Sequence, residues 1–234
     1  MGQRPETRFS GVVADRIALY VELDEAHSSY RVAADLLVRN ASPSPVQFIP
    51  VDLGPTCVVE ETDTGAGSSD GARRRSGEAE LVLATPLPPG ETLSGHVRYA
   101  CNYRPDRPWP LSRGAPPVLE HLRYPDFAAP PGGTWWDVTV SMPAGFSVIS
   151  NVPPVAEGGE VGRRRWVRLA GRAGELRVFG ATYARRQHDS LQGYAHPYHV
   201  RALDPLLAAV AQRVDYHRRW LGPARWHPDL TPRP

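Results

Sequence analysis

The chain has 234 residues and a mass of 25.7 kDa, which fits one large domain that can bury a core without covalent staples. Hydrophobic residues make up 41% and charged residues 22%, and this excludes a chain that is disordered as a whole. The 27 basic and 25 acidic residues leave a net charge of +2. That balance gives no reason to expect a nucleic-acid or anionic-membrane partner.

The amino terminus and the cysteines both bear on the cellular compartment. Residues 1–8 lead into no continuous apolar run, so the sequence predicts neither a signal peptide nor a membrane anchor, and we expect a cytoplasmic protein. Cys57 and Cys101 are the only cysteines and lie far apart in the sequence. In that compartment this favours reduced, buried thiols over a disulfide.

Alternating apolar residues predict a series of strands, each with one buried face. The runs lie at residues 16–23, 30–38, 46–53, 56–61, 79–84, 93–103, 136–142, 146–150, 165–169 and 175–183. About ten strands at this spacing are typical of a sandwich. We therefore predict a mainly β fold, an antiparallel β-sandwich or saddle, with Trp136 on an inward face and Trp135 on an outward one.

Two stretches interrupt the strands. Residues 63–78 are rich in Gly, Ser and Asp and contain three consecutive arginines, which predicts a solvated hairpin tip. Residues 102–133 are rich in proline but also carry Trp109, Tyr124 and Phe127. Because a free linker has no reason to carry such aromatic residues, we expect this segment to be ordered by packing.

The period changes near the carboxy terminus. Asp204 suits a helix N-cap and Pro205 suits the first helical position. The residues that then recur at helical spacing are Leu206, Leu207, Val210, Val214, His217 and Leu221. We predict one carboxy-terminal helix from Asp204 to the Gly222-Pro223 stop, with this stripe buried outside the sandwich core.

A search for catalytic motifs is negative, because none of the eight histidines opens a His-Glu-x-x-His zinc motif. His196 and His199 are spaced so that a loop could present both to a metal, but no third ligand is obvious. Glu120 precedes His121, yet neighbours in sequence point to different faces. We expect no catalytic residue and no bound cofactor or metal, with His196 and His199 as the remaining metal candidates.

Three segments occur in a familiar order: residues 87–99, Arg123-Tyr-Pro-Asp126, and residues 136–151. Together they resemble the amino-terminal domain of the aminopeptidase N family of zinc metallopeptidases, and the Pro-x-Gly-x-x-x-x-Ser-Asn turn at 143–151 is the most specific match. In that family a β-saddle domain precedes a thermolysin-like, zinc-binding catalytic domain. The resemblance covers residues 10–185, and residues 186–234 look like the linker and first helix of the catalytic domain.

The resemblance implies a truncated, noncatalytic domain that serves as a docking and substrate-gating scaffold for a catalytic domain absent from this chain. The residues we expect to contact a catalytic domain, another protein surface or a peptide are Trp109, Glu120, Tyr124, Phe127, Trp220 and Trp226. One feature of this chain differs from the family pattern. Family members commonly carry a glutamine that binds the free amine of the substrate, and this chain has no glutamine between residues 102 and 133. Glu120 is the only glutamate in that segment.

Two alternatives remain open. The chain could be a free-standing β-sandwich module that presents Trp109, Tyr124 and Phe127 to a peptide or protein. It could also be an enzyme that uses Glu120, His121 and the histidine cluster, although no nucleophile, base and orienting group line up.

Overall fold

The structure is a computed structural model that describes residues 11–24, 29–64, 78–102, 119, 122–160, 164–189, 191–195 and 197–221. The chain divides into two compact units, residues 1–181 and residues 182–234. Within the described residues, no helix has both the length and the apolar character needed to cross a bilayer.

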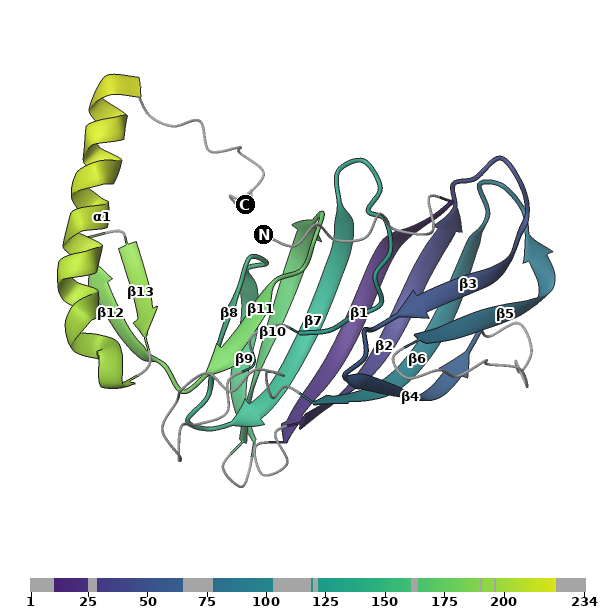
Figure 1. Cartoon of the computed structure of the whole chain (residues 1–234), viewed down its shortest axis with the longest axis horizontal. Coiled ribbons are helices and arrows are strands. Elements are labelled where there is room, and N and C mark those ends of the chain that lie inside the picture. Colours follow the sequence, from purple (N-terminus) through teal and green to yellow (C-terminus); the bar gives the residue numbers. More distant parts are fainter. Residues whose placement is uncertain are drawn as a thin grey trace. The chain divides into compact units, whose positions relative to one another are not determined.

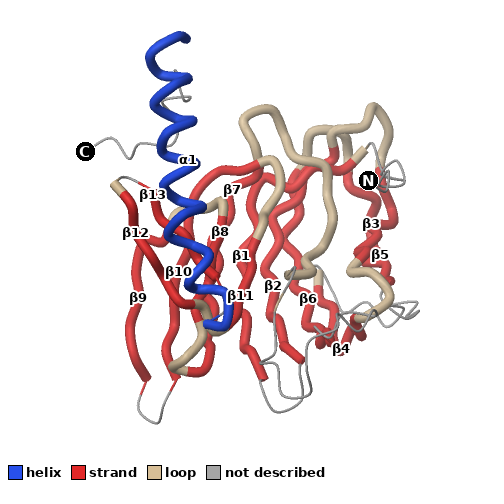
Figure 2. The backbone as a smooth tube through the Cα atoms, turned by 60° about the vertical axis from the view of Figure 1, so that its left-hand side comes forward, coloured by secondary structure: helices blue, strands red, loops and turns tan. Residues whose placement is uncertain are grey.

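Strands dominate the first unit (Figures 1 and 2). They are β1 (Val12–Asp24), β2 (Ser29–Asn40), β3 (Val46–Asp52), β4 (Cys57–Asp63), β5 (Glu78–Leu87), β6 (Thr92–Asn102), β7 (Thr134–Pro143), β8 (Ser147–Ser150), β9 (Pro154–Glu160), β10 (Arg164–Ala173) and β11 (Val178–Ala181). The mainly β, sandwich-like fold class predicted from the sequence is confirmed. Strand β9 was not predicted, because its proline and two glycines break the apolar alternation and it forms by pairing with β10.

Seven strands form one sheet in the order β4-β6-β2-β1-β7-β10-β9. Every neighbouring pair is antiparallel except β1 and β7, which run parallel. The sheet is therefore mixed, which corrects the purely antiparallel sandwich expected from the sequence. The parallel pair is possible because a long connection after β6 carries the chain across the sheet before β7 begins.

One face of this sheet is apolar from β4 to β10, whereas none of the described side chains of the edge strand β9 is buried. Alternate residues of β1, β2 and β7 point inward, and Trp136 is 2% exposed whereas its neighbour Trp135 is 40% exposed. Two short antiparallel sheets, β3 with β5 and β8 with β11, lie near opposite ends of the long sheet (Figure 1). Their inward residues, such as Ile49, Leu81 and Val178, join the same buried cluster.

The predicted hairpin tip at residues 63–78 needs a correction. Strand β4 pairs with β6 in the long sheet, whereas β5 pairs with β3 in a separate sheet. The segment thus connects two sheets rather than two hydrogen-bonded strands of one hairpin. Its arginines at 73–75 lie outside the described residues.

The two cysteines form a disulfide, so the prediction of reduced thiols is wrong. Cys57 on β4 stands directly opposite Cys101 on β6, and their Cα atoms are 4.1 Å apart. Both side chains are buried. The two residues are 44 positions apart in sequence, and only the strand register brings them together. Because disulfides persist mainly in oxidising compartments, the cysteines no longer support a cytoplasmic location.

The second unit contains a hairpin and one long helix. Strands β12 (Ala184–His188) and β13 (Leu191–Ala195) pair antiparallel, and a 3-10 turn (Pro197–His199) leads into α1 (Val200–Leu221). The sequence predicted neither strand, because both are short and β12 is mostly polar. The helix packs on this hairpin through Leu203 and Leu207, which are 6% and 7% exposed.

The start and the buried face of α1 differ from the prediction. The helix begins one turn earlier than Asp204, and Pro205 lies inside it, because burial of Leu203 against the hairpin outweighs the hydrogen bond that proline cannot donate. Leu206 and Val210, predicted to be buried, are 59% and 40% exposed. A Cβ atom at Gly193 would lie 2.8 Å from Leu203 Cδ1, so glycine is needed for this close approach.

Replacing Trp136 by Ala should lower the free energy of unfolding by about 3 to 5 kcal/mol, because it removes a buried indole whose Nε1 donates to the Ala173 carbonyl oxygen at 3.1 Å. The matched control, Trp135→Ala, removes a partly exposed indole and should cost about 1 kcal/mol or less. Urea unfolding of both variants measures the difference. The reverse order would mean that the register of β7 is wrong by one residue.

Replacing both Cys57 and Cys101 by Ala should lower the free energy of unfolding by about 2 to 4 kcal/mol, because the disulfide closes a long loop in the unfolded chain. Guanidinium unfolding without reductant measures this loss. Titration of the denatured wild-type protein should find no free thiol. Two free thiols, or an unchanged midpoint in the double variant, would contradict the disulfide.

Candidate functional site

Residues 122–128, here called the strap, cross the apolar face of the seven-stranded sheet. Arg123 is held at both ends of its backbone: its N–H donates to Tyr30 Oη at 2.9 Å, and its carbonyl oxygen accepts from Tyr99 Oη at 2.9 Å. At its far end the strap reaches β1, where the Ala14 N–H donates to the Ala128 carbonyl oxygen at 3.0 Å. The expectation that this proline-rich segment is ordered by packing is confirmed for its described part.

The two tyrosines are unusual because their hydroxyls are deeply buried. Burial raises the pKa of Tyr30 to about 12, and the hydrogen bond from the Arg123 N–H opposes this shift. Burial also raises the pKa of Tyr99 well above 10.0. Both groups are therefore neutral near pH 7, and they act as fixed hydrogen-bond partners of the strap. The sequence predicted only that Tyr30 and Tyr99 lie in strands, within residues 30–38 and 93–103, since nothing local reveals their polar partner.

The predicted contact residues of the proline-rich segment fall into two groups. Tyr124 is 8% exposed and packs edge-on against Trp136, with ring centroids 4.9 Å apart. Phe127 is partly buried against the same core. Trp109 and Glu120 lie outside the described residues. Tyr124 and Phe127 thus stabilise the domain itself and leave little aromatic surface for a partner.

The Pro-x-Gly-x-x-x-x-Ser-Asn turn, which carries the sequence resemblance, has a structural role. The Phe146 N–H donates to the Pro143 carbonyl oxygen at 2.9 Å, which closes the turn between β7 and β8. The Asn151 side chain donates to the Glu175 carbonyl oxygen at 2.8 Å and accepts from the Arg177 N–H at 2.7 Å. The asparagine therefore fastens the end of β8 to the chain that enters β11.

A hollow of about 470 Å³ lies on the outer face of the long sheet, beside Arg16, Asp35, Asp63 and His96. His96 Nδ1 is 2.7 Å from Asp35 Oδ1, and the register places Asp63 across from His96 on the other side. The Asp35 side chain is 78% exposed, so water screens its charge. These groups form a solvated cross-strand row, and we assign no chemistry to it.

A second charged group on the outer face ties three strands together. Asp137 on β7 accepts two hydrogen bonds from Arg168 on β10, each of 2.8 Å, and one of 3.4 Å from Arg16 on β1. The Arg168 guanidinium holds the pKa of Asp137 below its usual value. The carboxylate is thus ionised at neutral pH and serves as a structural ion pair.

Of the two metal candidates, only His199 is described. His196 lies outside the described residues, and His199 is exposed in the turn before α1. In the part of the chain that the structure describes, no three His, Cys, Asp or Glu side chains are placed to hold a metal ion. The zinc that the resemblance implies belongs to the catalytic domain of the family, and we derive no step through zinc on this chain.

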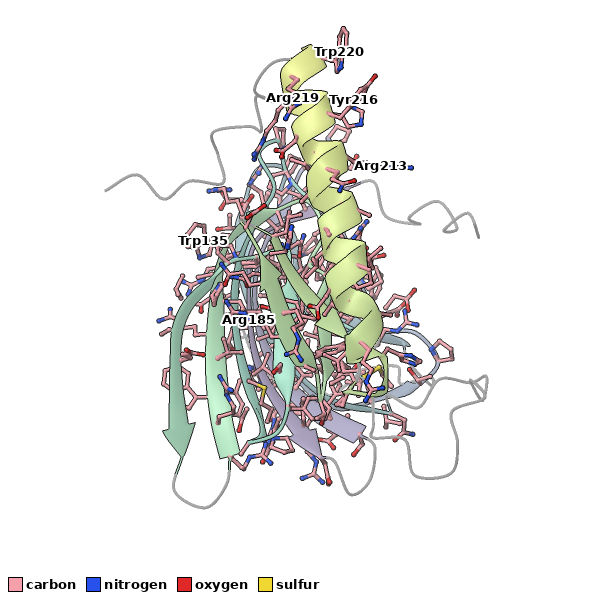
Figure 3. The ribbon with its side chains drawn as sticks, turned by 90° about the vertical axis from the view of Figure 1, so that its left-hand side faces the viewer. Trp135, Arg185, Arg213, Tyr216, Arg219 and Trp220 are labelled. Carbon is pink, nitrogen blue, oxygen red and sulfur yellow. A yellow bond between two sulfur atoms is a disulfide. The ribbon has the colours of Figure 1, made fainter. Side chains whose placement is uncertain are left out.

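Of the two predicted carboxy-terminal contact residues, only Trp220 is described, because Trp226 lies beyond the described residues. Trp220 is 73% exposed near the end of α1, next to Tyr216, which is 59% exposed (Figure 3). The two ring centroids are 6.1 Å apart. The sequence prediction missed Tyr216, although its spacing of four residues from Trp220 places both rings on neighbouring turns of one helix face.

Replacing Tyr30 by Phe should lower stability at neutral pH by about 1 to 3 kcal/mol, because the Arg123 N–H loses its acceptor. The same change should flatten the loss of stability above pH 10. In the wild type, the unfolded tyrosine ionises near pH 10 but the folded one only near pH 12, so stability is full below pH 10 and falls as the pH rises towards 12.

Urea unfolding between about pH 8 and pH 11 tests this prediction. Tyr20→Phe is the matched control, because Tyr20 is 51% exposed and its loss should leave stability at neutral pH unchanged. An identical profile for Tyr30→Phe and the wild type would show that the Tyr30 hydroxyl does not hold the strap.

Solved structures of M1 zinc metallopeptidases are similar to this chain. One from Deinococcus radiodurans, a mutant bound to a Tyr-Ser-Ala substrate, has a TM-score of 0.58 and 18% identity, covering 79% of this chain and 47% of that chain. The M1 zinc metallopeptidase from Deinococcus radiodurans has a TM-score of 0.58 and 17% identity, with 79% and 46% covered. A two-domain M1 zinc metallopeptidase mutant bound to L-arginine has a TM-score of 0.58 and 18% identity, with the same coverage.

At this level of identity the likeness concerns the fold alone, and this chain spans about half the length of those structures. No protein-family model and no curated protein matches the sequence. Over 79% of its length, the chain therefore has a fold found in M1 zinc metallopeptidases.

Proposed function

We propose that this chain is a noncatalytic, M1-like β domain that docks on a zinc metallopeptidase catalytic domain and helps to control access of the substrate. The observation that carries the proposal is the fold likeness, which extends over 79% of this chain but only 47% of the M1 structure. We expect the zinc and the catalytic residues in the part of an M1 protein that this chain does not match. This chain then contributes a scaffold and no cofactor.

The first unit has the properties of a scaffold. Its strap is fixed at Arg123 by two buried hydroxyls, and the edge of its sheet is fixed by the disulfide at Cys57. A rigid support of this kind can hold a wall beside the active site of another domain. Docking itself needs a further exposed surface, because Tyr124 and Phe127 are used for internal packing.

The purified chain, with zinc added, should release no amino acid from aminoacyl amides or short peptides. The physical reason is that a peptidase site needs three protein ligands around zinc and a positioned base. Robust turnover that persists through repurification and disappears with a chelator would overturn the noncatalytic assignment.

The docking part is tested separately with an M1-type catalytic domain encoded in the same genome. Size-exclusion chromatography with light scattering should detect a one-to-one complex, and adding the chain should change kcat/KM for tripeptides more than for aminoacyl amides, because a gating wall acts on longer substrates. The absence of a complex at micromolar concentrations would overturn docking. A complex with unchanged kcat/KM for both substrates would overturn the control of access.

A further inference from the structure

Helix α1 has two different faces. Its first face packs on the β12–β13 hairpin through Leu203 and Leu207. Its second face carries Leu206, Val210, Arg213, His217 and Trp220, and all five are exposed. We call this second set the α1 stripe.

The spacing of the α1 stripe is that of a helix–helix seam. Its members follow one another at intervals of four, three, four and three residues, the repeat that keeps side chains on one face when two helices pack side by side. From Leu206 to Trp220 the stripe is about 21 Å long at the rise of an α-helix. A partner helix of about four turns would cover it.

The composition of the stripe suits a protein contact. Trp220 supplies a large exposed apolar surface at one end, beside Tyr216 on the neighbouring turn (Figure 3). Leu206 and Val210 supply smaller exposed surfaces at the other end. Trp, Tyr and Arg are the residues most enriched among those that dominate interface energies. The stripe thus combines aliphatic, aromatic and arginine side chains, with Arg213 at its centre.

The charges around the stripe are unbalanced. The two aspartates of α1 are already paired: Asp204 lies 3.8 Å from Arg186, and Asp215 lies 3.8 Å from Arg218. Among the described residues, no ion pair is recorded for Arg213 or Arg219. The second unit as a whole has eight arginines against four aspartates. Helix α1 itself has four arginines against two aspartates, so it carries a net positive charge, and Arg213 in the stripe is complementary to a carboxylate.

We infer that the α1 stripe binds an acidic amphipathic helix, with apolar residues against Leu206, Val210 and Trp220 and a carboxylate against Arg213. This inference rests on the proposed function, because the catalytic domain is the partner expected to supply that helix. A carboxylate can accept two hydrogen bonds from one guanidinium, which makes Arg213 a specific partner as well as a positive charge.

The same observations favour a protein over an anionic membrane. A helix that lies in a membrane surface turns an uninterrupted apolar face towards the lipid chains and keeps its arginines at the border. In α1 two large apolar side chains, Leu203 and Leu207, already pack on the hairpin. The remaining stripe has Arg213 in its middle, where lipid chains would leave the guanidinium without a partner.

The direct test measures binding of the full chain to two synthetic helical peptides by calorimetry. Both peptides carry leucines at four-three spacing, and one has glutamates where the other has lysines. The glutamate peptide should bind, and affinity should weaken in about 0.5 M salt because exposed charges are screened. Trp220→Ala and Arg213→Glu should each weaken it about tenfold or more. The variant Arg213→Glu should in turn prefer the lysine peptide.

Two matched controls come from exposed residues elsewhere, Trp135→Ala on β7 and Arg185→Glu on β12 (Figure 3). Neither should alter binding, and circular dichroism checks that every variant keeps its fold. Equal binding of the two peptides by the wild type, or equal losses in Trp220→Ala and Trp135→Ala, would overturn the inference. Tight binding to vesicles of anionic phospholipid, without binding to the glutamate peptide, would also overturn it.

The catalytic domain separates this inference from the proposed function. If the domain binds the wild-type chain but binds Trp220→Ala and Arg213→Glu equally well, the proposed function stands and the α1 stripe is not the docking surface. If the glutamate peptide binds with the expected pattern but the catalytic domain does not bind, the chemistry of the stripe is supported and the proposed function fails.

Discussion

The whole first unit depends on covering one apolar face of a seven-stranded sheet. That face is too wide for a single neighbouring element, so the chain covers it with three pieces from distant parts of the sequence: β3 with β5, β8 with β11, and the strap at residues 122–128. Burial of apolar surface drives this assembly. The pieces then need specific contacts that hold them in place.

Those contacts are mostly polar, because a segment that crosses a sheet cannot join its ladder of hydrogen bonds. The strap would leave the Arg123 N–H and carbonyl group without partners in the interior, and the hydroxyls of Tyr30 and Tyr99 supply them. Asn151 does the same for the chain that enters β11. Residues of the motifs that resemble the family, such as Arg123 and Asn151, thus help to hold the fold together.

The second unit poses the opposite physical problem, since α1 has more apolar surface than its small hairpin can cover. Leu203 and Leu207 are buried there, but Trp220 and Tyr216 stay exposed. The likeness to M1 metallopeptidases concerns the fold of the chain, and the uncovered face of α1 is where we propose that a partner binds. The structural role of the first unit and the binding role of α1 are therefore separate questions that separate variants can answer.

The sequence by itself determined the local features: most strands of the first unit, the inward position of Trp136, the single helix and the mainly β class, because the period of apolar residues is a property of neighbouring positions. Tertiary structure decided what depends on residues far apart. The register of β4 on β6 places Cys57 opposite Cys101, and the chain path places β7 beside β1 in the parallel direction. Packing on the hairpin moved the start of α1 ahead of Pro205 and turned Leu206 outward, because burial against a neighbouring element outweighs local helix signals.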